Sequence, residues 1–265
     1  MARLLKSLYF SAILLFLAAP IIVVTGVSLN QPKRLLFPPQ GLSLRWYADL
    51  FREADWLLAI RNSLVIAGCA SVLAVSLALP LAFHIWRRPG RLSRLLFGLG
   101  VAPFMLPPVI SALGFMSFWI AAGHYGSIYA TIISHAVFLV SLPLVTISLG
   151  LRSVDAQLVE AAQTMGADAR TTFLTVTFPM IRPYLFSGFA FAFVLSLNEY
   201  IIAFMISGFT VETLPIKIFN SLRYGYTPVM AAVAVSFMAL AVVVFSLVAR
   251  FGDLPRLLGA ERTEN

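Results

Sequence analysis

The chain has 265 residues, of which 60% are hydrophobic and only 11% are charged, and its mean hydropathy is +0.92. A soluble domain carries about 25% charged residues, so a soluble fold of this composition would leave large apolar patches in water. The net charge of +8 does not indicate nucleic-acid binding, because the basic residues lie between hydrophobic runs, a pattern typical of topology-setting charges beside a membrane. The composition therefore predicts an integral membrane protein.

Six apolar segments are long enough to cross a bilayer as α-helices, which takes about 20 residues each. None alternates polar and apolar residues with the two-residue period of a transmembrane β-strand. The first segment follows Arg3 and Lys6 and resembles a signal peptide, but its apolar run continues to Val24, so we expect a retained helix. The sequence predicts an all-α membrane protein, a polytopic bundle forming a single transmembrane domain over residues 1–265. The expected helices span residues 7–29, 63–86, 95–122, 128–151, 184–206 and 229–249.

The basic residues are distributed unequally between the two sets of alternate loops. Arginines are densest between Arg87 and Arg94, in a short loop, and short loops with many basic residues stay on the cytoplasmic side. The cytoplasmic set comprises Arg3, Lys6, Arg87, Arg88, Arg91, Arg94, Arg152, Arg170, Arg182, Arg250, Arg256 and Arg262. This distribution predicts that both termini are cytoplasmic.

Residues 152–183, on the same cytoplasmic side, have the pattern of two short helices joined by a glycine. We expect Ser153 to cap the first helix, with Asp155 in its first turn. Gly166 suits the position after the helix end, where a positive φ is needed, and Asp168 suits the cap of a second helix that stops before Pro179. One apolar stripe on the first helix comprises Val154, Leu158, Ala161 and Met165. The segment is predicted to be a docking element below the bundle.

The docking segment also carries a family motif. Glu160-Ala161-Ala162 is followed by three residues, Gly166, nine residues and Val176-Thr177-Phe178-Pro179. This spacing resembles the signature E-A-A-x3-G-x9-I-x-L-P of the EAA-loop family of binding-protein-dependent ABC transporter permeases (type I importers), with apolar replacements at Val176 and Phe178. The resemblance covers the chain from the second helix onward. It implies that the ATPase-coupling residues are Glu160, Ala161, Ala162, Gly166, Ala167, Phe173 and Pro179.

The resemblance also implies the partners and location of the chain. A permease of this family is a non-catalytic subunit of the bacterial inner membrane, embedded in the lipid bilayer. It works with an ABC ATPase subunit dimer, a second homologous permease subunit and a periplasmic solute-binding protein, without nucleic acid or a cofactor. The fifth and sixth helices resemble the polyamine-type permeases, specifically the C-type subunit of spermidine and putrescine systems. We therefore expect a small solute, either a polyamine or a related charged metabolite.

A few polar or helix-breaking positions within the apolar segments are candidates for the substrate path. Glu199, next to Asn198, is an ionisable group within the predicted fifth helix, and such groups in hydrocarbon are usually functional. The alternative is an acid that reaches the outer interface beside Tyr200. Pro107 and Pro108, with Pro103, break the third helix, which then either lines the pore or only bends in packing.

Two further features narrow the function. His135 lies inside the fourth helix, where a hydrogen bond between helices is more usual than a substrate contact. The chain has no G-x-x-x-x-G-K-[ST] segment to bind nucleotide phosphates, and its lone Cys69 forms no metal-binding cluster, so neither a metal nor catalysis is expected. The alternative function is a self-sufficient channel or secondary transporter. Such proteins often contain internal repeats and several intramembrane charges, which this sequence does not show.

Overall fold

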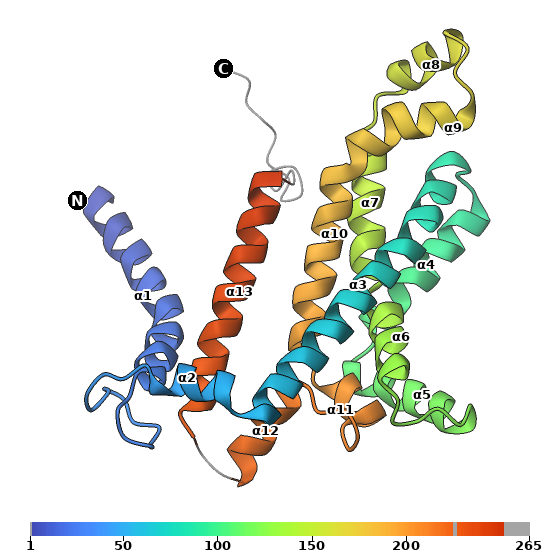
Figure 1. The fold of residues 1–265 in the computed structure, drawn as a ribbon. Coiled ribbons are helices and arrows are strands. Elements are labelled where there is room, and N and C mark those ends of the chain that lie inside the picture. Colours follow the sequence, from blue (N-terminus) through green and yellow to red (C-terminus); the bar gives the residue numbers. More distant parts are fainter. Residues whose placement is uncertain (1, 225–226, 252–265) are drawn as a thin grey trace. The chain divides into compact units, whose positions relative to one another are not determined.

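The computed structural model describes residues 2–224 and 227–251, and all its elements there are helices (Figure 1). They are α1 (Ala2–Ser28), α2 (Arg45–Arg52), α3 (Ala54–Arg87), α4 (Arg91–Met105), α5 (Pro108–Ala121), α6 (Ile128–Leu139), α7 (Ser141–Arg152), α8 (Ala156–Thr164), α9 (Ala169–Thr172), the π-helix η1 (Phe173–Thr177), α10 (Phe178–Asn198), α11 (Ile201–Ser207), α12 (Leu214–Tyr224) and α13 (Val229–Phe251). The all-α fold class is confirmed. Arg256 and Arg262, from the predicted cytoplasmic set, lie outside the described residues.

Within the described part of the chain, four helical segments are long and apolar enough to cross a membrane, or six if each bent helix pair is one span. The first, second and last expected spans correspond to α1, α3 and α13. The fourth corresponds to α6 and α7, which meet at an angle of 43°. Helix α3 begins at Ala54, so the end of the expected outer loop is already helical. Four of the six predicted crossings therefore correspond to helical segments of the described chain.

The third predicted span is broken into two helices. Helices α4 and α5 meet at 103°, with Pro107 and Pro108 at the break. Pro107 has no N–H to donate to the carbonyl of Pro103, and the Ser111 hydroxyl donates to that carbonyl instead, at 3.2 Å. The interruption predicted within residues 95–122 is therefore present, and it is sharp because consecutive prolines remove more than one helical hydrogen bond.

The fifth predicted span, residues 184–206, differs at both ends. At its start, α9, η1 and α10 form a 30-residue helical segment from Ala169 to Asn198, so the predicted stop before Pro179 is wrong. The π-helical turn ends where α10 begins, and Pro179 lies in the first turn of α10, where a missing N–H costs little. At its end, α10 stops at Asn198, and α11 is a separate short helix.

The chain divides into two compact units, and the first comprises residues 1–59 and 217–242. Its loop between α1 and α2 is organised by Asn30, whose side-chain oxygen accepts the N–H of Gln40 at 2.8 Å. The backbone carbonyl of Asn30 accepts the indole N–H of Trp46 at 2.6 Å, and Trp46 is buried. The Tyr47 and Ser28 hydroxyls lie 2.8 Å apart, which fixes α2 to the end of α1.

The second unit comprises residues 60–216 and 243–251 of the described chain, and its centre is the pair α7 and α10. Two glycines allow the close approach of these helices. A Cβ atom on Gly150 would meet the Tyr184 ring at 2.6 Å, and one on Gly188 would lie 2.8 Å from the backbone of Pro143. Small residues at helix contacts are the usual means of tight packing in membranes. Helix α3 adds a buried alanine seam consisting of Ala67, Ala70, Ala74, Ala78 and Ala82.

Candidate functional site

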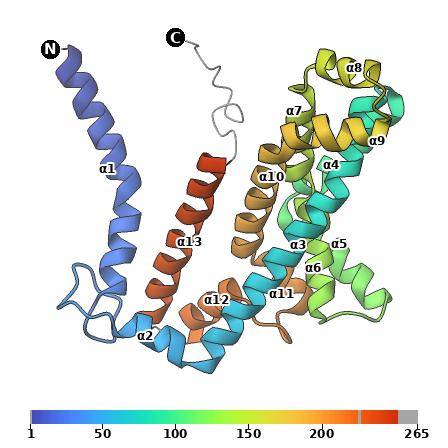
Figure 2. The same ribbon diagram turned by 45° about the horizontal axis from the view of Figure 1, so that its top comes forward.

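The first candidate region is the coupling segment, residues 152–183, which contains α8, α9 and η1. Both Figure 1 and Figure 2 show α8 and α9 beyond one end of α7 and α10, while α11 lies at the opposite end of α10. Asp155 caps α8, with its carboxylate accepting the N–H of Gln157 at 2.9 Å. Ser153, the expected cap, instead donates to the Gly150 carbonyl at the end of α7. The N-cap of α8 is therefore Asp155, two residues after the predicted cap Ser153.

The turn between α8 and α9 has the geometry that the sequence predicted. Gly166 has φ +90, a left-handed conformation that other residues rarely adopt, and a Cβ there would meet nothing within 4 Å. Asp168 caps α9, because its carboxylate accepts the N–H of Thr171 at 2.7 Å. The hydrogen bonds from Thr171 hold the pKa of Asp168 below its ordinary value.

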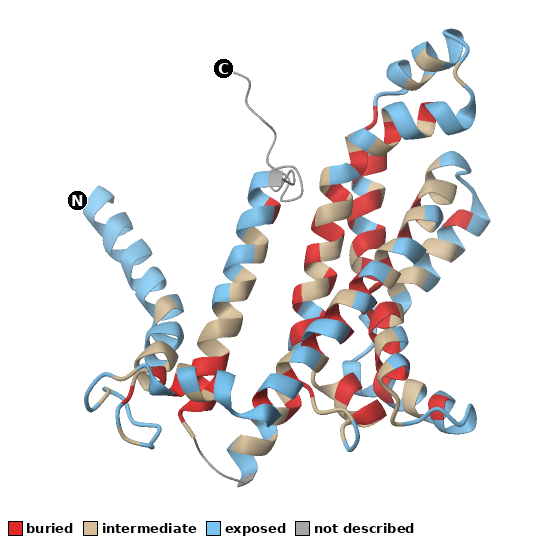
Figure 3. Ribbon diagram, in the orientation of Figure 1, coloured by how far each residue is buried: buried red, intermediate tan, exposed pale blue. Residues whose placement is uncertain are grey.

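Most of the coupling segment is exposed (Figure 3). Helix α8 contains no buried residue, Glu160 and Ala161 are exposed, and Met165 is 88% exposed. An open hollow of about 500 Å³ is lined by Ala162, Met165, Gly166, Ala167, Asp168 and Thr171. The structure thus places Glu160, Ala161, Ala162, Gly166 and Ala167 on one projecting turn with small side chains and an exposed methionine. This is the geometry of a surface that another protein approaches closely.

Phe173 and Pro179 lie apart from that turn. The Phe173 ring is half-buried and packs edge-on against Phe83 of α3, with ring centroids 5.0 Å apart, and it also contacts Phe178. Pro179 is exposed in the first turn of α10. Phe173 therefore joins the coupling segment to α3 through an aromatic contact. Its role toward an ATPase stays a prediction.

The second candidate region is the buried polar cluster, defined as His135, Ser196 and Glu199. Both oxygens of the Glu199 carboxylate accept the N–H of Ile202 at 2.9 Å, and one also accepts the N–H of Ala203 at 3.1 Å, so Glu199 caps α11. His135 Nε2 lies 3.3 Å from Glu199 Oε2, within ion-pair distance but not aligned as a hydrogen bond. His135 Nδ1 is hydrogen-bonded to the Ser196 hydroxyl at 2.8 Å.

The other predicted path residues are exposed. The Asn198 side chain is exposed and donates to the Val194 carbonyl of its own helix at 2.8 Å. Pro107 and Pro108 are exposed at the start of α5. Helix α5 packs with α11 in one apolar cluster that includes Ala112 and Ile202. The helix that begins at Pro108 and the helix that Glu199 caps therefore lie together, although no substrate role follows from this arrangement alone.

Comparison with known proteins identifies the family. Residues 70–253 match the family described as binding-protein-dependent transport system inner membrane component. The chain belongs to this family. It is a permease subunit of an ABC importer, a multi-pass membrane protein without a catalytic role.

The permease is similar to two proteins of Escherichia coli (strain K12). It is 34% identical over 227 residues to the putrescine transport system permease protein PotI, covering 83% of this chain and 80% of that protein. It is 26% identical over 241 residues to the spermidine/putrescine transport system permease protein PotC, covering 91% of each.

Solved structures have the same fold at low sequence identity. A bacterial ABC transporter involved in the import of the acidic polysaccharide alginate gives a TM-score of 0.72 at 16% identity, with 94% of this chain and 95% of that chain covered. The MetNI methionine ABC transporter in an inward-facing conformation gives a TM-score of 0.64 at 18% identity, with 79% and 97% covered. At these identities the likeness shows the fold.

Sequence reasoning missed the polar pairs that join helices of the permease. It did not pair His135 with Glu199, although each was singled out. The Thr131 hydroxyl of α6 lies 2.6 Å from the Ser207 hydroxyl of α11, and both residues are buried. Serine and threonine are common in membrane helices, so no single-residue signal marks such a pair.

Proposed function

We propose that the permease imports a polyamine or a related small charged solute. A periplasmic solute-binding protein delivers the solute, and a second homologous permease subunit completes the translocation path. A separate ABC ATPase dimer drives the transport cycle by moving the coupling segment, which rocks the helices between outward-open and inward-open states. The names of the relatives, which concern putrescine and spermidine, support this choice of solute.

One observation carries the proposed coupling to an ATPase. The turn formed by α8, Gly166 and α9 is ordered by its own caps, exposed on its surface and fixed to α3 through Phe173. A segment that only connected two spans would not need this combination. A segment that transmits the movement of a partner protein needs order, exposure and a fixed contact with a membrane helix, because it must keep its shape, bind the partner and displace the helix.

We further propose that the end of the bundle bearing the coupling segment is cytoplasmic, as are both termini. The arginines around the ends of α3, α4 and α7 support this orientation, since basic residues are retained on the cytoplasmic side. The bacterial inner membrane is the matching location, as the description of the family indicates.

The coupling proposal is tested by Gly166→Val with a matched control, Gly123→Val. Both glycines have positive φ, at +90 and +74, and at both a Cβ would meet nothing within 4 Å, so the local backbone strain is similar. Gly166→Val should reduce co-purification of the ATPase at least several-fold, because the strain displaces the turn. Gly123→Val, at the turn after α5, should leave it unchanged. Equal co-purification for both variants would overturn the proposal.

We propose that Pro107, Pro108, Asn198 and Glu199 lie along the substrate path. Cys69 is the only cysteine, so a Cys69→Ser background allows single cysteines to be introduced. Asn198→Cys and Pro107→Cys should react with a membrane-impermeant methanethiosulfonate, and saturating solute should slow the reaction. Phe16→Cys, in the apolar window of α1 where no residue is buried, should stay unreactive. Unreactive cysteines at both path positions would remove them from the path.

The solute proposal is tested separately with proteoliposomes that contain the complete transporter. ATP-dependent uptake of radiolabelled putrescine, competed by spermidine but not by a neutral amino acid, is the expected result. Uptake that proceeds without the ATPase would favour a secondary transporter instead. ATP-dependent uptake of another solute, with no putrescine uptake, would replace the solute but leave the coupling proposal intact.

A further inference from the structure

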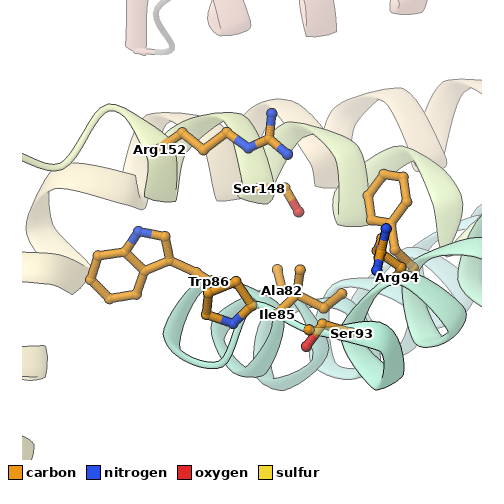
Figure 4. Close-up of a pocket in the computed structure, with 10 residues that line it drawn as sticks. Ala82, Ile85, Trp86, Ser93, Arg94, Ser148 and Arg152 are labelled. Carbon is orange, nitrogen blue, oxygen red and sulfur yellow. The ribbon is translucent and has the colours of Figure 1, made fainter.

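The inference concerns a pocket in the second unit, separate from the coupling turn and from the buried polar cluster. The pocket has a volume of about 540 Å³ and lies where the ends of α3, α4 and α7 meet. Its lining includes Trp86 from α3, Ser93 and Arg94 from α4, and Ser148 and Arg152 from α7. In Figure 4, Arg152 and Ser148 extend from α7 along one wall, while the Trp86 indole and Arg94 lie toward opposite ends.

The polar groups of this pocket all favour an anion. Arg94 and Arg152 each bring a guanidinium, and no carboxylate of the described part of the chain lies within 4 Å of either. Helix α4 has 15 residues, and residues at its start, including Gly90 and Ser93, form part of the lining.

The remaining lining is apolar, which favours an amphiphilic ligand over a small ion. Ala82, Ile85, Trp86 and Phe97 form this part of the pocket. A ligand with a phosphate near the arginines and a short hydrocarbon portion against these apolar side chains would match both parts of the lining.

We propose that this pocket is a binding site for a phosphate group, with the Arg94 and Arg152 guanidiniums as the binding groups. The phosphate is that of an anionic phospholipid or of a soluble phosphate ester. Basic pockets between membrane helices at the cytoplasmic side bind lipid headgroups by this chemistry, and paired guanidiniums match phosphate geometry. The site is independent of the solute that the permease carries.

The test uses the complete transporter, purified in detergent and supplied with phosphatidylglycerol or phosphatidylcholine. Native mass spectrometry counts the retained lipids. The wild type should retain phosphatidylglycerol in preference to phosphatidylcholine. R94Q/R152Q should reduce that retention roughly ten-fold or more, because a hydrogen bond to a charged group contributes about 1.5 kcal/mol or more and both pocket guanidiniums are removed. The control R88Q/R91Q removes the same charge from exposed positions outside this pocket and should have little effect.

Further arms separate the sources and protect against misfolding. R94K/R152K keeps the charge and should retain part of the binding, whereas a folding defect would not distinguish Lys from Gln. Binding of glycerol 1-phosphate or inorganic phosphate that depends on Arg94 and Arg152, without lipid preference, would support a soluble phosphate. Equal retention of the two lipids together with no phosphate binding, or equal loss in R88Q/R91Q, would overturn the proposal.

Discussion

The coupling segment and the buried polar cluster both rely on carboxylates that cap helices, but they use them in opposite ways. In the coupling segment, Asp155 and Asp168 bond to amides two and three residues away, and the surrounding side chains stay exposed. In the cluster, Glu199 caps α11 and also meets His135, which bonds to Ser196, 61 residues further along the chain. One region is shaped locally and leaves its surface for a partner. The other uses its polar groups to join three helices.

This difference predicts where a substitution acts. A change in the buried polar cluster removes contacts between distant helices, so it should lower the stability of the chain. A change in the coupling segment removes only local contacts, so it should alter partner binding while stability is preserved. The following predictions test that division.

The largest effect on stability is expected for Glu199→Ala. The substitution removes the acceptor for the Ile202 and Ala203 amides and leaves His135, which is 1% exposed, without its counterpart. The free energy of unfolding should fall by about 3 kcal/mol, the usual scale for breaking a buried polar pair. Equilibrium unfolding in mixed micelles measures it. Glu199→Gln keeps an oxygen for the cap and should lose about half as much, whereas wild-type stability in Glu199→Ala would contradict the division.

A smaller loss is expected for Ser196→Ala. His135 Nδ1 would then be buried without a hydrogen-bond partner, which costs roughly 1–2 kcal/mol. Ser76→Ala is the matched control, because the exposed Ser76 donates only to the Val72 carbonyl of its own helix. The double variant with Glu199→Ala should lose less than the sum of the two single losses, since both act on His135. Strict additivity would show that the cluster is not a unit.

The same contrast explains what the sequence predicted well. The caps and the glycine turn of the coupling segment depend on neighbouring residues, so the positive φ of Gly166 and the cap at Asp168 were predictable from local rules. The six apolar segments were predictable because the bilayer sets their length. Even here the cap of α8 was displaced, because Ser153 and Asp155 both suit that position.

The features that were not predicted depend on contacts between segments that are distant in sequence. Glu199 was singled out as an ionisable group inside a helix, but the chain breaks there, and the carboxylate caps the next helix. Neither the break nor the partnership with His135 has a local signal. The 103° bend at Pro107 and Pro108 was likewise underestimated, because the prolines indicate an interruption but not its angle. From the sequence, Arg94 and Arg152 were expected only to help set the orientation of the chain in the membrane, and a pocket between them was not predicted.

A local, pH-dependent effect is expected at Asp168. The pKa of this carboxyl is lowered from 3.8 in the fold by the hydrogen bonds from Thr171, so folding favours the ionised form. The contribution of the cap is therefore complete above about pH 4 and is lost as the pH falls through the lower folded pKa. Amide hydrogen exchange at Thr171, corrected for intrinsic rates, should rise at low pH in the wild type. Asp168→Asn should abolish that dependence without changing global unfolding.

The smallest effect on stability, and the sharpest separation of the two regions, is expected for Glu160→Ala. Glu160 is exposed on α8, and no basic side chain of the described residues forms a salt bridge with it. The free energy of unfolding should therefore change by less than about 0.5 kcal/mol. If the coupling segment docks on an ATPase, the same variant should weaken co-purification, because the acidic group then loses a basic partner across the interface. Gln163→Ala, exposed on the same helix outside the motif, should change neither quantity. A Glu160→Ala chain that unfolded more easily but bound the ATPase fully would reverse the division, placing the importance of this acid inside the chain.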